Sequence, residues 1–313
     1  MRRQRFFINW QIVLALVILT LYVAVAVAAP WLAPQSDPQE PTAFRLMPGV
    51  RPSALGPPRP PNPAALLGTA PGGWDILYSL VWGARPVLRF GLVTALTTAW
   101  LGVMVGALSG YLEGRSNQLV MRITDAFLAF PAIAGIVLFR QILTPAGTDA
   151  PLNMLQRVTS ALSLDPVMLA LILFSWMPYA RIIGANVSAL KQAEYALAAK
   201  TVGVRPLRII FRHLLPNAIA PAIVLAARDI GGVVILEAAF TFIGIGSGLP
   251  WGAVAVAGRD WVIGPGGNPL TYWWVFVPVT LVLILFSVGW NLLGDGLNTV
   301  LNPKSSQAMR RLG

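Results

Sequence analysis

Ionisable side chains are sparse in this sequence, and three of them interrupt one apolar stretch, from about Ala218 to Ile245. These are Arg228, Asp229 and Glu237. An ionisable group at the depth of a bilayer costs about 3 kcal/mol on insertion scales. We therefore expect the three side chains to face a water-filled cavity or protein rather than lipid. The Arg228–Asp229 pair either lines a path for a solute and contacts its charged ends, or forms a buried structural ion pair with a neighbouring helix.

A second group of polar residues lies between Lys191 and Asn217, a stretch that we name the docking segment. Gln192 to Val202 is rich in good helix formers, and Gly203 follows where a helix commonly stops. Pro206 suits the first position of a second short helix, because its fixed φ is helical and its missing N–H is not needed there. The sequence predicts that this second helix ends at Pro216.

The docking segment has the composition of a contact surface for another protein. Leu207, Ile210, Phe211 and Leu214 recur at helical spacing, while the arginines of the second helix project elsewhere. Alanines at positions 196, 198 and 199 leave the first helix thin, so that another backbone can approach it. The alternative is a cytoplasmic loop whose basic residues only reflect the positive-inside tendency.

Several kinds of chemistry are excluded by composition. Cysteine is absent, which rules out disulfides, iron–sulfur clusters and thiol catalysis. A site built from histidines is not expected, because His213 is the single histidine. The formal charge of +11 does not indicate nucleic-acid binding, because the arginines cluster between apolar spans. Gly264-Pro265-Gly266-Gly267 lacks the lysine and serine or threonine of a phosphate-binding loop.

The elements that position these residues are predicted to be membrane helices. With 56% hydrophobic and 11% charged residues, the chain cannot bury its apolar groups in one soluble core. We predict an all-α polytopic membrane protein with six transmembrane helices. The expected spans are Ile12 to Ala29, Phe90 to Tyr111, Leu119 to Leu143, Pro166 to Val187, Ala218 to Ile245 and Leu270 to Leu293.

The remaining segments complete the predicted organisation. Residues 1–33 hold an N-terminal tail and the first span, for which a cleaved leader ending near Ala28 is the alternative. Residues 34–85 form an external proline-rich loop, 86–303 the core with a cytoplasmic loop at 188–217, and 304–313 a tail. We expect a further external segment at 144–165, with an amphipathic helix from Leu152 to Leu162, and a third external loop containing Trp251-Gly252.

Two local features are expected within the spans. Arg122 and Asp125 lie three residues apart, and we predict that they pair near the cytoplasmic interface. The pair either anchors the helix end or takes part in a conformational change. Pro178 should kink the fourth span just before the docking segment.

Six crossings that start inside place both termini and the docking segment in the cytoplasm. More lysines and arginines then lie inside than outside, in agreement with the positive-inside rule.

The docking segment also resembles a known family. Ala198-Ala199, Gly203 and Leu215-Pro216 are ordered as in the EAA signature of permeases of ATP-binding-cassette (ABC) importers, with Leu197 at the usual glutamate position. The fuller run from Glu194 to Asn217 is similar to the version of the dipeptide and oligopeptide importers. Further runs that resemble this family are Leu66 to Arg85, Met121 to Pro131, Glu237-Ala238, Phe242 to Gly246 and Asn291 to Pro303.

The resemblance implies a type I ABC importer permease fold with a cytoplasmic coupling helix, in a bacterial or archaeal inner membrane. The implied partners are a homologous second permease, two ATPase subunits, an external substrate-binding protein and membrane lipid, without nucleic acid. The chain itself would be non-catalytic and hold no cofactor, since ATP and Mg belong to the ATPases. The residues implied to contact an ATPase are Glu194, Ala198, Ala199, Lys200, Gly203, Arg205, Pro206, Arg208, Arg212 and Pro216.

The substrate stays open at this point. The resemblance favours dipeptides or oligopeptides, and permeases of the same family for nickel chelates, glutathione or sugars are the first alternative. A secondary transporter driven by an ion gradient is a second alternative. It predicts inverted hydropathy repeats and paired broken helices, which we do not find in the sequence.

Overall fold

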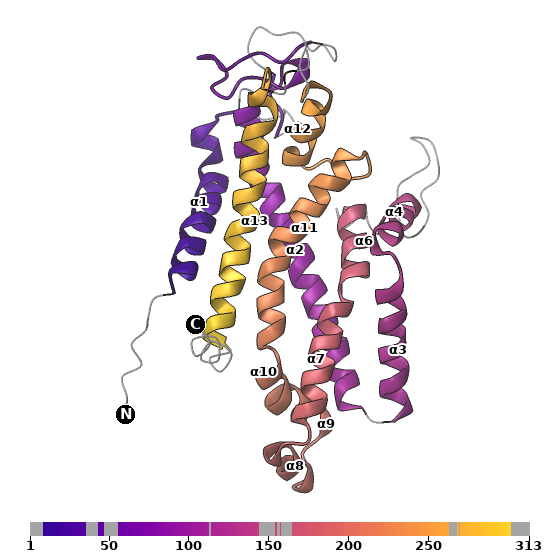
Figure 1. The fold of residues 1–313 in the computed structure, drawn as a ribbon. Helices are drawn as coiled ribbons and strands as arrows, with labels where there is room; N and C mark the ends of the chain where they lie inside the picture. Colours follow the sequence, from indigo (N-terminus) through magenta and orange to yellow (C-terminus); the bar gives the residue numbers. More distant parts are fainter. Residues whose placement is uncertain are drawn as a thin grey trace. The chain divides into compact units, whose positions relative to one another are not determined.

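The computed structural model describes residues 9–35, 43–46, 56–112, 114–143, 154, 157, 165–262, 268 and 270–301. Both tails of the chain, the run 264–267 and most of the expected helix at 152–162 lie outside these residues. Within the described chain the long regular elements are helices, and β contacts are limited to isolated bridges. The all-α prediction is confirmed (Figure 1).

Four described helices are long and apolar enough to cross a membrane, and two bent helix pairs raise the number to six if each pair is one span. The six predicted crossings agree with this higher count. The membrane-length elements are α1 (Trp10–Leu32), α2 (Ile76–Tyr111), α6 (Pro166–Ser175) with α7 (Met177–Leu190), and α13 (Trp273–Leu301). The bent pairs join α3 (Arg115–Ala129) to α4 (Ala132–Leu143), and residues 206–218 to α11 (Ala220–Phe242).

The third span is not the continuous helix that the sequence predicts. The chain bends by 92° between α3 and the helix that follows it. The bend lies at Phe130 and Pro131, and a proline disfavours helical geometry in the residue before it. At 15 residues, α3 is about 22 Å long, which is shorter than the roughly 30 Å of a hydrocarbon core.

Two predicted external loops contain helix. The second span begins at Ile76, well before Phe90, because the Asp75 carboxylate accepts from Tyr78 N at 3.2 Å and caps the first turn. Residues 76–85 are therefore helical rather than part of the 34–85 loop. Trp251 lies in α12 (Pro250–Gly258), where it is buried and donates from its indole N–H to Leu80 O at 3.0 Å.

The fourth span begins where its sequence indicates. Asp165 accepts from Val167 N and Met168 N, and Pro166 occupies the first turn. The helix is interrupted at Trp176, close to the kink predicted at Pro178, because Pro178 has no N–H for the preceding turn. α6 and α7 still act as one 25-residue span.

Contacts divide the chain into two compact units that share several long helices. One unit contains Val93–Ile230, together with the chain up to Ile12 and from Leu293. The other contains Val13–Leu92 and Gly231–Leu292.

In the second unit, Arg85 compensates for a proline in α1. Pro30 has no N–H, which leaves the carbonyl of Ala26 without its intrahelical partner. The Arg85 guanidinium donates to Ala26 O and, at 3.2 Å, to Val27 O. A ring cluster of Tyr22, Trp251 and Phe286 packs in the same unit, with centroids 5.3–5.8 Å apart.

In the first unit, α2 and α7 pack backbone to backbone. Glycines at positions 102, 106 and 110 recur every four residues, so they share one face of α2. A Cβ at Gly106 would lie 2.6 Å from Ala180 O, and one at Gly110 would lie 2.5 Å from Gly184 O. Only small residues permit this approach, which is typical of helix pairs in membranes.

Candidate functional site

The docking segment folds as two short helices joined by a tight turn. α8 spans Glu194–Thr201 and α9 spans Pro206–Ile209, in agreement with the predicted break and restart. Gly203 has φ +81°, Gly203 N donates to Lys200 O, and Val204 N donates to Ala199 O, both at 3.1 Å. This pair of bonds is a Schellman cap, which requires the left-handed conformation that glycine adopts without a Cβ penalty.

The chain after α9 differs from the prediction. Pro216 does not end the helix, because a π-helical turn at Ile210–Leu214 continues into α10 (Leu215–Ala218). Leu215 N donates to Ile210 O, five residues back. The wider turn shifts the hydrogen-bonding pattern just where Pro216 supplies no N–H, so the chain remains helical through the proline.

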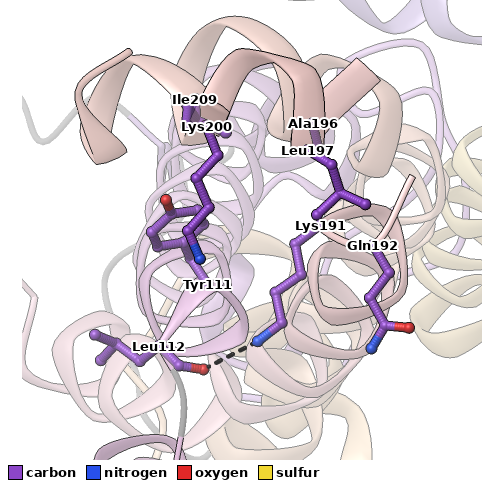
Figure 2. Close-up of a pocket in the computed structure, with 8 residues that line it drawn as sticks. All are labelled: Tyr111, Leu112, Lys191, Gln192, Ala196, Leu197, Lys200 and Ile209. Carbon is purple, nitrogen blue, oxygen red and sulfur yellow. Dashed lines mark hydrogen bonds between the residues drawn. The ribbon is translucent and has the colours of Figure 1, made fainter. Parts of the chain in front are cut away.

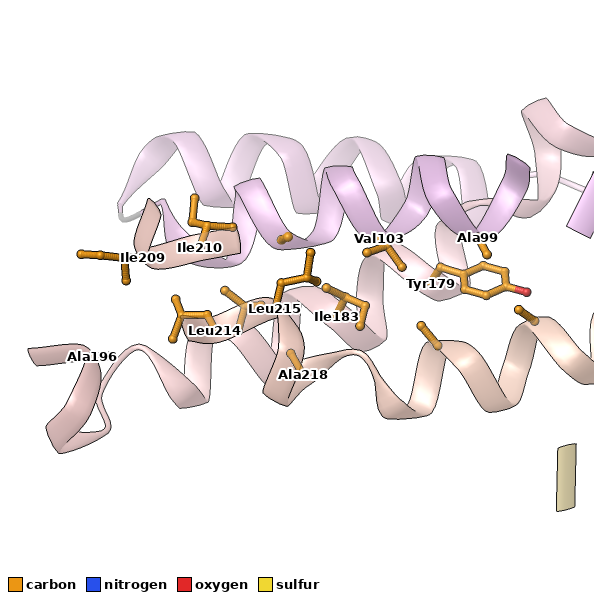
Figure 3. Packing of buried hydrophobic residues seen from close by; sticks show 14 residues of the cluster. Ala99, Val103, Tyr179, Ile183, Ala196, Ile209, Ile210, Leu214, Leu215 and Ala218 are labelled. Atoms are coloured by element: carbon orange, nitrogen blue, oxygen red, sulfur yellow. The ribbon is translucent and has the colours of Figure 1, made fainter. Parts of the chain in front are cut away.

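One side of the docking segment is buried against α2 and α7. Ala196, Ile209, Ile210 and Leu214 are each at most 3% exposed. They belong to one apolar cluster with residues of α2, α7 and α11, as Figure 3 shows for Ile183 and Val103. The docking segment is therefore held by the same apolar cluster that contains residues of α2, α7 and α11.

The other side of the docking segment is exposed and combines apolar with cationic side chains. Val202 is 83% and Leu207 is 61% exposed, although both are large aliphatic residues. Of the ten residues implied to contact an ATPase, Ala199 is half-buried against the core, and the other nine, Gly203 among them, are exposed. The other exposed members are Glu194, Ala198, Lys200, Arg205, Pro206, Arg208, Arg212 and Pro216.

Arg228 and Asp229 of α11 contact neighbouring helices. Arg228 pairs with Asp295 of α13, and Tyr179 of α7 donates to the Asp229 carboxylate at 2.6 Å. Both contacts join α11 to another helix, but each residue has a separate partner, and the side chains of Arg228 and Asp295 are 44% and 41% exposed rather than buried. The path role of Arg228 and Asp229 stays a prediction.

Glu237 lies in the other unit and closes the loop that follows α11. Its side chain is buried and accepts from Thr241 Oγ1 and Ser247 Oγ, each at 2.6 Å, and from the backbone N–H of Ser247 and Leu249. A Cβ at Gly246 would lie 1.9 Å from Thr241 Oγ1. The chain from Thr241 to Leu249 thus forms a tight loop around the Glu237 carboxylate.

The predicted pair of Arg122 with Asp125 is wrong. Asp125 pairs with Arg181 of α7, and both side chains are about half exposed. The spacing in α3 allows an Arg122 contact, but sequence spacing cannot show that another helix brings a second arginine to the same carboxylate.

Sequence reasoning missed Tyr179, Arg181, Asp295 and the glycines of α2. The four-residue spacing of the glycines was an available signal for close helix packing. No sequence signal connected Tyr179 to Asp229 or Arg228 to Asp295, because these pairs come from separate helices.

Comparison with known proteins places this geometry in a family. Residues 102–307 match the family described as binding-protein-dependent transport system inner membrane component. Residues 1–48 match the N-terminal transmembrane domain of oligopeptide transport permease C.

Individual relatives cover nearly the whole chain. The chain is 30% identical over 292 residues to a probable D,D-dipeptide transport system permease protein of Escherichia coli, which covers 92% of this chain and 86% of the relative. It is 31% identical over 296 residues to a di/tripeptide transport system permease protein of Pseudomonas aeruginosa, with 94% and 88% covered. A glutathione transport system permease protein of Pectobacterium atrosepticum is 32% identical over 248 residues, with 78% and 74% covered.

The membrane-length helices, the exposed docking segment and these matches agree, and the chain belongs to the family of inner membrane permease components of binding-protein-dependent ABC transport systems.

Proposed function

We propose that the chain is one transmembrane subunit of an ATP-driven importer of peptides, and that a partner ATPase docks on the exposed face of α8 and α9. The observation that carries this proposal is the two-sided docking segment. One face is fixed in the core with α2 and α7, and the other exposes Val202 and Leu207 beside three arginines.

The charge of this face favours an acidic partner surface. Arg205, Arg208 and Arg212 are exposed, and within the described segment Glu194 is the one carboxylate. Apolar anchors surrounded by cations favour a groove with an apolar floor and an acidic rim. The docking segment and both termini then face the cytoplasm, and the partner ATPases bind ATP and Mg.

Coupling would act through α7. A partner that moves α8 moves the apolar cluster in which α8, α2 and α7 share side chains. Rigid elements with two discrete arrangements convert such a local contact into a change of the membrane helices. A homologous second permease would supply the rest of the pathway, and an external binding protein would deliver the solute.

Peptides are the proposed substrate because permeases named for dipeptides, di/tripeptides and oligopeptides are about 30% identical over most of this chain. Glutathione is a second candidate, since a glutathione permease is 32% identical. Mass spectrometry of the ligand carried by the binding protein distinguishes the two, and a ligand that is neither would reject both.

Docking is tested with Leu207→Asp and Arg208→Glu in the purified assembly. Loss of a central apolar anchor costs about 2 kcal/mol at an interface, so Leu207→Asp should weaken ATPase binding about 30-fold. Arg115→Glu is the matched control for the charge reversal, because Arg115 is also exposed but lies on α3. If both Arg208→Glu and Leu207→Asp bind the ATPase as tightly as the unaltered protein does, docking at this face is rejected.

A further inference from the structure

Three polar contacts join four helices of the first unit at one level. Each contact links two different helices, and the helices are α3, α7, α11 and α13. The two groups of α7 are separated by a rise of about 3 Å, and the two groups of α11 are consecutive in sequence. The six side chains therefore form one layer, which we name the charged layer. Its pairs are Arg181 with Asp125, Tyr179 with Asp229, and Arg228 with Asp295.

The charged layer lies well inside the membrane-length helices. α2 and α7 end side by side, because Lys191, directly after α7, donates from Nζ at 3.3 Å to the carbonyl of Leu112, directly after α2 (Figure 2). Tyr179 lies about 16 Å along the helix axis from Leu190, where α7 ends. A hydrocarbon core is roughly 30 Å thick, so the charged layer lies near its middle rather than at a headgroup surface.

Asp229 is the carboxylate of the charged layer that has no cationic partner among the described residues. The other two carboxylates each pair with an arginine, so both guanidinium groups of the layer are already engaged. Asp229 accepts from the phenol of Tyr179 at 2.6 Å, and this neutral donor leaves the negative charge of the carboxylate without a counterion. An unpaired charge is costly at this depth. One cation next to Asp229 would complete the layer.

The carboxylate of Asp229 can be reached from the surface of the first unit. Asp229 is half-buried, and the neighbouring side chains of Arg228 and Asp295 are 44% and 41% exposed. Fully buried Tyr179 occupies Oδ2 of Asp229, while Oδ1 accepts no hydrogen bond within the described chain. Lipid cannot solvate these groups, so this surface faces water or another polar group.

The one free oxygen of Asp229 selects the kind of cation. A guanidinium group binds a carboxylate best through two parallel N–H bonds, one to each oxygen, but Tyr179 already occupies Oδ2. An ammonium group is a compact point charge with rotatable donors, so it can bind through a single oxygen. A primary ammonium therefore matches Asp229 better than an arginine of another subunit does. Peptides carry such a group at their amino end.

We propose that Asp229 binds the α-ammonium group of the peptide while the peptide crosses the membrane. The inference rests on the proposed function, peptide import, and assigns one end of the solute to one side chain. Arg228 is then not the substrate contact, because Asp295 already holds it. Peptides with a free amino end pass more readily than peptides with a blocked one.

Uptake of dialanine and N-acetyl-dialanine by the assembly reconstituted in vesicles tests the proposal. Asp229→Asn removes the charge and nearly keeps the volume of the side chain. We expect dialanine uptake, per amount of assembled protein, to fall about ten-fold, which is the loss of one charge-assisted contact. N-acetyl-dialanine has no ammonium group, so its uptake should fall much less. Asp229→Glu keeps the charge and should restore part of the preference for dialanine.

Asp125→Asn is the matched control, because it removes another carboxylate of the charged layer, one that already pairs with Arg181. It should change the uptake of the two peptides by the same factor. If Asp229→Asn also changes both by the same factor, or leaves both unchanged, the proposal is overturned while peptide import stands. If the unaltered assembly takes up neither peptide, the proposed function itself is rejected, and the peptide as ligand of Asp229 with it.

A second measurement does not depend on delivery by the binding protein. The detergent-purified assembly is treated with dicyclohexylcarbodiimide, which modifies carboxyl groups in apolar surroundings, and modification of Asp229 is followed by mass spectrometry. Dialanine should slow this modification, and N-acetyl-dialanine should not. Equal rates with both peptides would contradict the proposal. Modification that is slowed by the bound second permease, and not by dialanine, would assign Asp229 to an ammonium group of that partner and overturn the peptide site.

Discussion

Tyr179 donates a 2.6 Å hydrogen bond to Asp229, and this contact ties α7 to α11 inside the first unit. Tyr179 is 0% exposed, and it belongs to the same apolar cluster as the docking segment. Two residues along α7, Arg181 pairs with Asp125 of α3. α7, whose far end leads into the docking segment, therefore has polar contacts with two different helices near its start.

Tyr179→Phe should destabilise the permease by about 1–3 kcal/mol, because the half-buried Asp229 carboxylate loses its donor. Thermal unfolding in detergent measures the loss. The double variant with Tyr179→Phe and Asp229→Asn should lose less stability than the sum of the losses in the two single variants, since both changes remove the same contact. Tyr195→Phe is the control, because Tyr195 is 42% exposed. Full additivity of the first two changes would contradict a direct contact.

Gly106→Ala should separate α2 from α7, because the added Cβ would lie 2.6 Å from Ala180 O, a backbone atom that cannot move without the helix. Overpacking of this kind costs about 1–3 kcal/mol. Gly232→Ala in α11 is the matched control, since nothing lies within 4 Å of its added Cβ. Unfolding in detergent should distinguish the two variants, and equal stabilities would show that the α2–α7 contact tolerates a methyl group.

Gly203→Ala should reduce coupling of ATP hydrolysis to transport, because alanine at φ +81° costs about 1–2 kcal/mol and favours a different turn between α8 and α9. Gly114→Ala is a close control, since Gly114 also has a positive φ, of 64°, with open space around it, but lies before α3. ATP hydrolysis and uptake are measured together in reconstituted vesicles. A coupling ratio that falls equally in both variants would argue against a specific role of the α8–α9 turn.

The sequence predicted those parts of the fold that depend on local chemistry. Gly203 and Pro206 set the break in the docking segment, and Asp165 with Pro166 set the start of α6. These residues act through backbone conformation and capping, which neighbouring residues in sequence decide.

Features that depend on the packing of separate helices were not predictable in the same way. Pro131 and Pro216 both follow large apolar residues, but the chain bends sharply at the first and stays helical through the second. The π-helical turn before Pro216 decides the second case, and no local residue pattern indicated it. The partner of Asp125 was missed for a related reason, because Arg181 comes from a helix that is distant in sequence.

The last prediction separates the two roles left open for Arg228. If Arg228 only joins α11 to α13, then Arg228→Ala and Asp295→Ala should have similar effects on assembly and uptake, and the combined variant should be no worse than either. Exchange of the two residues, Arg228→Asp with Asp295→Arg, should then restore part of the uptake. If Arg228 contacts the charged end of a substrate, Arg228→Ala should change the preference among peptides with free and blocked termini, while Asp295→Ala should not. We expect the structural outcome, because Arg228 already binds a carboxylate of its own chain. Uptake of peptides with free and blocked termini by the assembled variants measures the difference, and a change of preference confined to Arg228→Ala would restore the path role.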